Sequence, residues 1–157
     1  MSNQERISPA LGKIISGLYI VTTAFEGKRH GMLASFIEQA GFQPPLITMA
    51  MGKGRVIGDI IDQQPIFGIN ILGQHNHELL RPFVKNTGDD PFDGHAMVEN
   101  EWGVPQLAES LAFLACRAVT RVDAGDHWLY LAEVIDGALQ HDHEHPMTRI
   151  RRNGFDY

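Results

Sequence analysis

The stretch LYIVTTAFEGKRHGMLASFI, residues 18–37, decides the fold. Its first seven residues are rich in β-branched side chains, which favour a strand over 18–24. A polar run with two glycines follows and predicts a turn over 26–31. The apolar residues after it predict a second strand over 32–37. Strand, turn and strand in immediate succession indicate an antiparallel hairpin.

The rest of the chain repeats short elements separated by turns. Further strands are predicted at 46–51, 66–72, 111–122 and 128–135, helices at 8–15, 56–63 and 77–84, and a loop over 87–95. The Gly-x-Gly-x-x-Gly run of dinucleotide-binding folds is absent from the sequence. We therefore predict a mainly β fold with short helices, a closed or split β-barrel, in preference to a parallel sheet.

Composition sets the class of protein. With 157 residues, 43% of them hydrophobic and 20% charged, the chain is expected to form a single domain over residues 1–157. Its net charge of -6 argues against nucleic-acid binding, which needs a basic surface. The polar N-terminus does not have the form of a secretion signal, and no run approaches the ~20 apolar residues of a membrane span, so we expect a cytoplasmic protein.

The single cysteine, Cys116, lies in an apolar run. One thiol forms no internal disulfide and holds no iron–sulfur cluster. We expect it to be a buried small apolar residue, since a reactive thiol needs an electropositive and partly exposed setting.

The segment Gly52-Lys53-Gly54-Arg55 is the best local anion site in the sequence. Glycines let the backbone approach an anion closely, and the N-terminus of the helix predicted from Val56 favours a phosphate. Ser35, on the second strand, offers a hydroxyl. The alternative is that Lys53 and Arg55 are solvated surface cations.

Several short runs, taken in order, resemble a known family. They are Gly-x-x-Ala-Ser at 31–35, Pro-Pro at 44–45, Lys-x-Arg at 53–55, Phe-x-Ile-Asn-Ile-Leu at 67–72, Pro-x-Leu at 105–107, Leu-x-Cys at 114–116, Gly-Asp-His at 125–127 and Gly-x-x-Tyr at 154–157. From residue 10 to 157 the chain resembles the flavin reductase-like, FMN-binding split-barrel family. Within it, the runs at 32–35 and 39–45 look closest to the flavin reductase module of cyanobacterial flavodiiron proteins.

The resemblance implies a homodimeric split barrel that binds FMN near the subunit interface and takes electrons from NADH or NADPH. The residues it assigns to the cofactor are Met32, Leu33, Ala34, Ser35, Gln39, Ala40, Lys53, Arg55, Asn70 and Phe83. Gln39 and Ala40 would face the flavin from a turn. Many free-standing reductases have Thr or Ser where this chain has Leu33, so one hydroxyl of the cradle is missing. Because the flavodiiron and flavodoxin-like domains are absent, a stand-alone module with a separate partner is expected.

His127 is the residue that the resemblance places near the reactive face of the flavin, as a positioning or proton-supplying group. The alternative is a turn residue bonded to Asp126. The activity implied is an NAD(P)H:flavin oxidoreductase that passes electrons to free flavin, iron or a protein acceptor. A flavoredoxin-like carrier that holds FMN but oxidises NAD(P)H poorly is the second hypothesis.

The run His141-Asp142-His143-Glu144-His145 raises a third hypothesis, a metal-binding accessory protein. On a strand its three histidines would share one face, and imidazole binds zinc, nickel and copper. The run precedes Pro146 and has no further ligand at a recognisable spacing. We therefore expect a solvated loop and assign no metal ligand.

Overall fold

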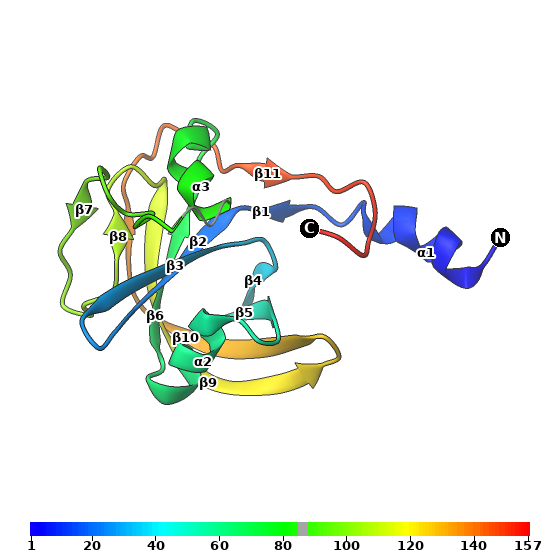
Figure 1. The fold of residues 1–157 in the computed structure, drawn as a ribbon, viewed down its shortest axis with the longest axis horizontal. Coiled ribbons are helices and arrows are strands. Elements are labelled where there is room, and N and C mark those ends of the chain that lie inside the picture. The colour runs from blue at the N-terminus through cyan, green and yellow to red at the C-terminus, as the bar shows by residue number, and fades with distance from the viewer. Residues whose placement is uncertain (85–87) are drawn as a thin grey trace.

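A computed structural model describes residues 1–84 and 88–157 (Figure 1). The predicted loop over 87–95 extends one residue outside this range. In the described part, helices and strands alternate as α1 (Asn3–Leu11), β1 (Ser16–Gly17), β2 (Tyr19–Phe25), β3 (Lys28–Ala34), β4 (Ile37–Phe42), β5 (Pro45–Gly52), α2 (Val56–Gln63), β6 (Ile66–Ile71), α3 (His77–Val84), β7 (Met97–Val98), β8 (Gln106–Leu107), β9 (Ala112–Ala124), β10 (His127–Leu139) and β11 (Thr148–Arg149).

The main sheet has the strand order β3-β2-β6-β9-β10-β5-β4, and all its neighbours are antiparallel. The sheet curls into a barrel that is not closed, because β3 and β4 are both edge strands. The split-barrel prediction is confirmed. The helices α2 and α3 both pack against β3, so the opening of the barrel lies beside them (Figure 1).

The β2–β3 hairpin is tighter than the sequence predicts. Glu26 and Gly27 have φ values of 51° and 76°, the left-handed pair of a two-residue hairpin turn. The predicted turn over 26–31 was therefore too long, and the strand predicted over 32–37 begins at Lys28 and ends at Ala34. The chain changes direction at residues 35–36 and enters β4, a separate strand that the sequence reading missed.

The first helix also differs from its prediction over 8–15. It begins at Asn3, because Ser2 and Glu5 form a capping box: Ser2 Oγ accepts from the Glu5 N–H and the Glu5 carboxylate accepts from the Ser2 N–H. The Ser8-Pro9 pair, read as a helix start, lies inside α1. No residue of α1 is buried, and the helix projects from the barrel (Figure 1).

Two apolar clusters flank the β2–β3 side of the sheet. Alternate residues of β2 point to opposite faces, so Val21 joins the cluster with α2 and Ile20 joins the cluster with α3. The first cluster includes Met49, Ile57 and Phe67, and the second includes Leu79 and Phe92. The helices are therefore fixed on either side of the edge strand β3.

None of the helices among residues 1–84 and 88–157 is long and apolar enough to cross a membrane.

Candidate functional site

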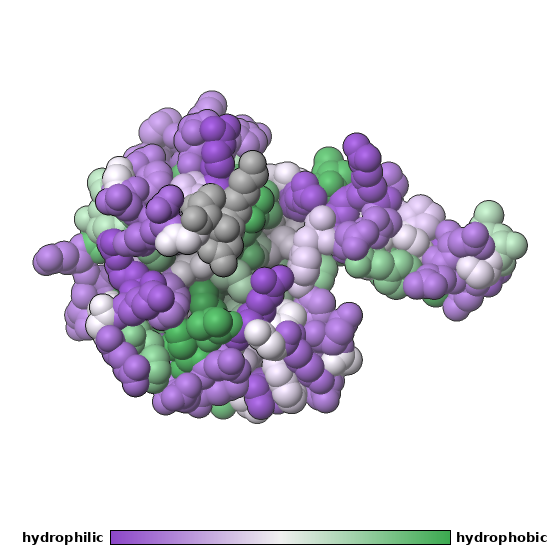
Figure 2. All heavy atoms as spheres, viewed as in Figure 1, coloured by the Kyte–Doolittle hydropathy of each residue, from purple (hydrophilic) through white to green (hydrophobic). Residues whose placement is uncertain are grey.

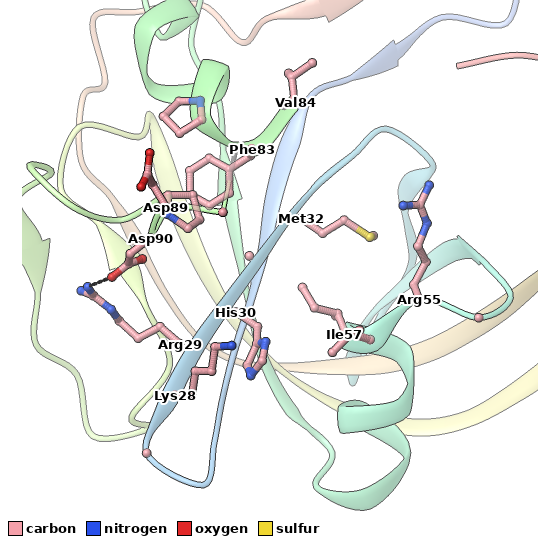
Figure 3. Close-up of a pocket in the computed structure, with 17 residues that line it drawn as sticks. Lys28, Arg29, His30, Met32, Arg55, Ile57, Phe83, Val84, Asp89 and Asp90 are labelled. Atoms are coloured by element: carbon pink, nitrogen blue, oxygen red, sulfur yellow. Dashed lines mark hydrogen bonds and ion pairs between the residues drawn. The ribbon is translucent and has the colours of Figure 1, made fainter. Parts of the chain in front are cut away.

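A cavity of about 900 Å³ follows the free edge of β3, between α2 and the end of α3 (Figure 3). That volume lies in the upper part of the range for small-molecule sites, roughly 300–1,000 Å³. As the outer strand of the sheet, β3 presents backbone N–H and C=O groups that no neighbouring strand pairs. The lining residues are Gly27, Lys28, Arg29, His30, Gly31, Met32, Gly54, Arg55, Val56, Ile57, Pro82, Phe83, Val84, Gly88, Asp89, Asp90 and Pro91.

The two faces of β3 carry different walls of the cavity. Met32 packs against the cluster that contains Ile57 of α2. On the opposite face, Gly31 leaves room for α3, since a Cβ there would lie 2.4 Å from the ring of Phe83 and 2.8 Å from that of Phe92. Phe83 and Phe92 meet edge to face at 5.1 Å between ring centroids. The cavity is apolar along its middle, as a flat aromatic ligand requires.

Arg55 marks one end of the cavity (Figure 3). It is the N-cap residue of α2 and makes no side-chain capping hydrogen bond, so the first-turn N–H groups are left without a side-chain acceptor. Beside it, Gly54 has a φ of 85°, and a Cβ built there would meet no atom within 4 Å. A helix N-terminus, an open glycine and a guanidinium together suit a phosphate.

Lys53 does not line this cavity. Its Nζ donates to Asp123 Oδ1 at 2.7 Å and lies 4.5 Å from the centroid of the Trp128 ring. The hydrogen bond from Lys53 is the main cause that lowers the pKa of Asp123. Of the two cations predicted to hold a phosphate, only Arg55 therefore faces the cavity.

Some of the other predicted cofactor residues line the cavity and the rest do not. Met32 and Phe83 line the cavity, whereas Leu33 packs into the α3-side cluster and Ala34 against the α2-side cluster. Ser35 is buried just beyond the end of β3. Gln39 and Ala40 lie exposed on β4, not on a turn, because the chain forms a strand there.

Asn70 is fully buried and makes structural hydrogen bonds. Its Oδ1 accepts from the Leu107 N–H at 2.8 Å, and its Nδ2 donates to the carbonyls of Ile20 and Pro105 at 3.2 and 3.3 Å. These bonds tie the 105–107 segment to β2 and β6. Asn70 is not among the residues that line the cavity.

His127 opens β10 and lies in a small aromatic cluster. Its Nδ1–H donates to Asp126 Oδ1 at 2.7 Å, and its Nε2 accepts from the Tyr157 hydroxyl. Phe36 packs against both rings, with centroid distances of 5.9 Å to His127 and 5.2 Å to Tyr157. The bond to Asp126 expected for a turn residue is present, and the Tyr157 contact was not predicted.

Tyr157 of this cluster interacts electrostatically with Arg55, which lines one end of the cavity. Burial raises the pKa of Tyr157, while the nearby charge of Arg55 opposes that rise. Hydrogen bonding to His127 lowers the pKa of Asp126. Asp126, His127 and Tyr157 therefore form a hydrogen-bonded chain near the Arg55 guanidinium.

Two candidates from the sequence remain, Cys116 and the run 141–145. Cys116 is buried, as predicted, and burial raises the pKa of its thiol to about 12. The run 141–145 is a turn, with His141 Nε2–H donating to the Ala108 carbonyl at 3.0 Å. Within residues 1–84 and 88–157, no three His, Cys, Asp or Glu side chains converge on a metal position.

Sequence reasoning missed Lys28, His30 and Ile57 as lining residues. Lys28 and His30 fell in the predicted turn. Their alternation with Met32 is the signal that identifies them, because residues at i, i+2 and i+4 of a strand share a face.

Residues 11–155 match the family model described as the flavin reductase like domain. The chain belongs to this family. Diflavin flavoprotein A 1 of Synechocystis is 35% identical over 136 residues, which is 85% of this chain and 24% of that protein. A second diflavin flavoprotein of Synechocystis is 38% identical over 146 residues, 90% of this chain. The chain spans about a quarter of the length of these curated relatives.

Solved structures show the same fold. The NADH:FAD oxidoreductase SgcE6 of Streptomyces globisporus superposes with a TM-score of 0.82 at 26% identity, covering 93% of this chain and 87% of that one. The flavin reductase PheA2 gives a TM-score of 0.78 at 28% identity, with 94% and 93% covered. The predicted family is confirmed. The predicted resemblance to the flavin reductase module of cyanobacterial flavodiiron proteins is confirmed by the diflavin flavoprotein relatives.

Proposed function

We propose that the chain is an NAD(P)H:flavin oxidoreductase that binds FMN in the cavity along β3. In this reaction a hydride passes from the nicotinamide to the flavin, and electrons leave to free flavin, iron or a protein acceptor. The observation that carries the proposal is the cavity itself. It joins an apolar middle, a free strand edge and the Arg55 guanidinium at a helix N-terminus that has no side-chain cap, in a member of the flavin reductase family.

The residues present fit FMN. The 5′-phosphate matches Arg55 and the uncapped start of α2. The ring matches the apolar wall of Met32, Ile57 and Phe83, and its polar edge matches the free backbone groups of β3. When bound, a flavin supplies the hydride and electron-transfer chemistry that no side chain provides. FMN, and not FAD, is proposed because one phosphate site lies at the Arg55 end.

In this assignment the protein binds, orients and excludes water. Arg55 fixes the phosphate, and the two walls of the cavity hold the ring plane between α2 and α3. Leu33 packs against the α3-side cluster and so helps to hold β3 in place. As a leucine, it offers the cofactor no hydroxyl. Ser35 is proposed to contact the ring edge and the ribityl phosphate, and Gln39 and Ala40 are proposed to face the flavin, as the family resemblance implies.

His127 is proposed to position the nicotinamide or to hold a proton near the flavin. Asp126 orients the ring by accepting from Nδ1–H, and the Tyr157 hydroxyl occupies Nε2. Hydride transfer itself needs little acid–base assistance, so His127 is proposed as a positioning group and not as an essential catalyst. Because it would orient the nicotinamide and not hold FMN, its loss is expected to affect the rate more than FMN binding.

A homodimer is proposed through an arm formed by α1 and the segments 12–15 and 150–157. The C-terminal segment packs on α1, with Arg151 donating to the Leu11 carbonyl at 3.3 Å. The arm exposes Ile14, Ile15 and Ile150, each more than 60% accessible, and its nine-residue helix buries nothing (Figure 2). A helix that short is marginal alone, and a second copy would supply its packing. The double variant Ile14→Glu, Ile15→Glu should be a monomer in sedimentation velocity. A dimer that persists in this variant would contradict the arm interface.

An absorbance spectrum of the purified protein, followed by anaerobic NADH and then NADPH, tests the activity. A flavin spectrum that bleaches rapidly supports the oxidoreductase and identifies its donor. A flavin spectrum that persists with both donors favours the carrier. Failure to bind added FMN would refute the site.

A further inference from the structure

A second group of polar side chains lies in the same cavity, away from Arg55. Lys28, His30 and Met32 share one face of β3, and all three line the cavity. Figure 3 shows Lys28 and His30 together near the β2–β3 turn, with Met32 and Ile57 between them and Arg55. The cavity therefore has two separate basic ends joined by an apolar middle.

The charge at the Lys28 end is available to a ligand. The neighbouring Arg29 points to the other face, where its guanidinium bonds Asp90 at 2.6 Å and lies 5.2 Å from the Phe92 ring centroid (Figure 3). Across residues 1–84 and 88–157, no hydrogen bond or ion pair is formed by the Lys28 ammonium. Burial lowers the pKa of His30, and the Lys28 charge lowers it further. Lys28 thus offers an ammonium and His30 an N–H donor.

Two carboxylates also line this cavity and limit what the Lys28 end can bind. Asp90 pairs with Arg29 at 2.6 Å and accepts from the Phe92 N–H at 3.0 Å, and the Lys28 charge adds a smaller part to the lowering of its pKa. Asp89 is drawn beside Phe83 in Figure 3. An anion is therefore favoured on the Lys28–His30 face, and a hydroxyl donor on the Asp89 side.

We propose that Lys28 and His30 form a second anion subsite, which binds the ribose 2′-phosphate of a phosphorylated nicotinamide dinucleotide. The proposal rests on the proposed function for the flavin at the Arg55 end. A compact phosphomonoester dianion fits an ammonium and an imidazole N–H on one strand face, and the volume of about 900 Å³ leaves room for a second ligand beside one flavin. This subsite gives the chain a preference for NADPH over NADH.

The test is calorimetric titration of the FMN-loaded protein with adenosine 2′,5′-bisphosphate and with AMP, neither of which is redox-active. The bisphosphate should bind roughly tenfold more tightly than AMP, the effect of one charge-assisted contact. Lys28→Gln should abolish this difference. Lys53→Gln is the matched control, since it removes the same charge from a lysine that pairs with Asp123 outside the cavity, and it should retain the difference.

Equal binding of the two nucleotides by the unaltered protein would overturn the proposal, as would loss of the difference in Lys53→Gln. Tighter binding of AMP would show that Asp89 governs this end, and would also overturn it. A second arm compares FMN with riboflavin: Lys28→Gln should leave their affinity ratio unchanged, and a fall would place Lys28 on the flavin phosphate instead. If FMN fails to bind at all, the proposed function fails, and the same titration of the protein without FMN still decides the subsite.

Discussion

Replacing Arg55 by alanine should weaken FMN binding far more than replacing Lys53. Both cations lie in one loop, two residues apart, and both substitutions remove one positive charge. Only Arg55 lines the cavity, whereas Lys53 is held by Asp123 at 2.7 Å and by the Trp128 ring. Comparing the two variants therefore distinguishes a direct contact between Arg55 and the phosphate from a general effect of positive charge in the loop.

The expected magnitude follows from the phosphate contact. A hydrogen bond to a charged group contributes about 1.5–3 kcal/mol, and about 1.4 kcal/mol corresponds to a tenfold change in affinity. Arg55→Ala should thus raise the Kd for FMN by about 10- to 150-fold. Lys53→Ala should change it less than about threefold, since an exposed charge acting at a distance is screened by salt. Because Arg55 makes no side-chain cap, its loss should leave α2 intact.

Flavin fluorescence quenching gives both affinities, with riboflavin as the internal control. Riboflavin has no phosphate, so its Kd should not respond to Arg55→Ala. The reasoning is refuted if Lys53→Ala weakens FMN as much as Arg55→Ala, or if riboflavin and FMN lose affinity equally. The first result would mean that Lys53 leaves Asp123 to bind the ligand, and the second would mean that Arg55 supports the cavity walls.

Four further predictions concern other residues. His127→Ala should slow anaerobic flavin reduction at least about tenfold in stopped-flow traces while the Kd for FMN changes less than about threefold; a selective loss of affinity would make His127 a binding residue. Asn70→Ala should lower the free energy of unfolding by about 3 kcal/mol in urea, since the Leu107 N–H loses its buried acceptor, and an unchanged midpoint would contradict that. The raised pKa of Cys116, about 12 against an ordinary 9.0, means that the native state keeps a proton that the unfolded chain releases. Stability should therefore fall above about pH 9, and Cys116→Ala should remove that component of the loss. At the acid end, the Phe92 N–H and Arg29 lower the pKa of Asp90, so its contribution is present above the usual carboxyl pKa and is lost as pH falls below it.

The sequence alone determined the class of fold and most of the elements. The helices over 56–63 and 77–84 were predicted with their observed bounds, because apolar residues at helical spacing are a local signal. The strand at 66–71 and the turn at Gly125 were likewise encoded locally. The ordered motifs identified the family, which the match over residues 11–155 confirms.

Two element boundaries in the N-terminal part of the chain were not predicted. The length of β3 follows from its register on β2, in which Lys28 lies opposite Phe25, and no local pattern in the polar 26–31 run reveals that. The capping box at Ser2 and Glu5 is a local signal. The prediction of a helix over 8–15 did not use it, so the predicted helix began too late.

Only the tertiary structure decided which polar residues face the cavity. Lys53 and Arg55 look equivalent in sequence, yet Asp123, seventy positions away, binds one of them and leaves the other at the cavity. Asn70 and Met32 were both predicted to border the flavin, but the three partners of Asn70 come from β2, β8 and the residue preceding β8, and they bury it. The physical reason is that local sequence sets backbone preference, whereas the partner of a charged or polar side chain is chosen by strand pairing across the whole chain.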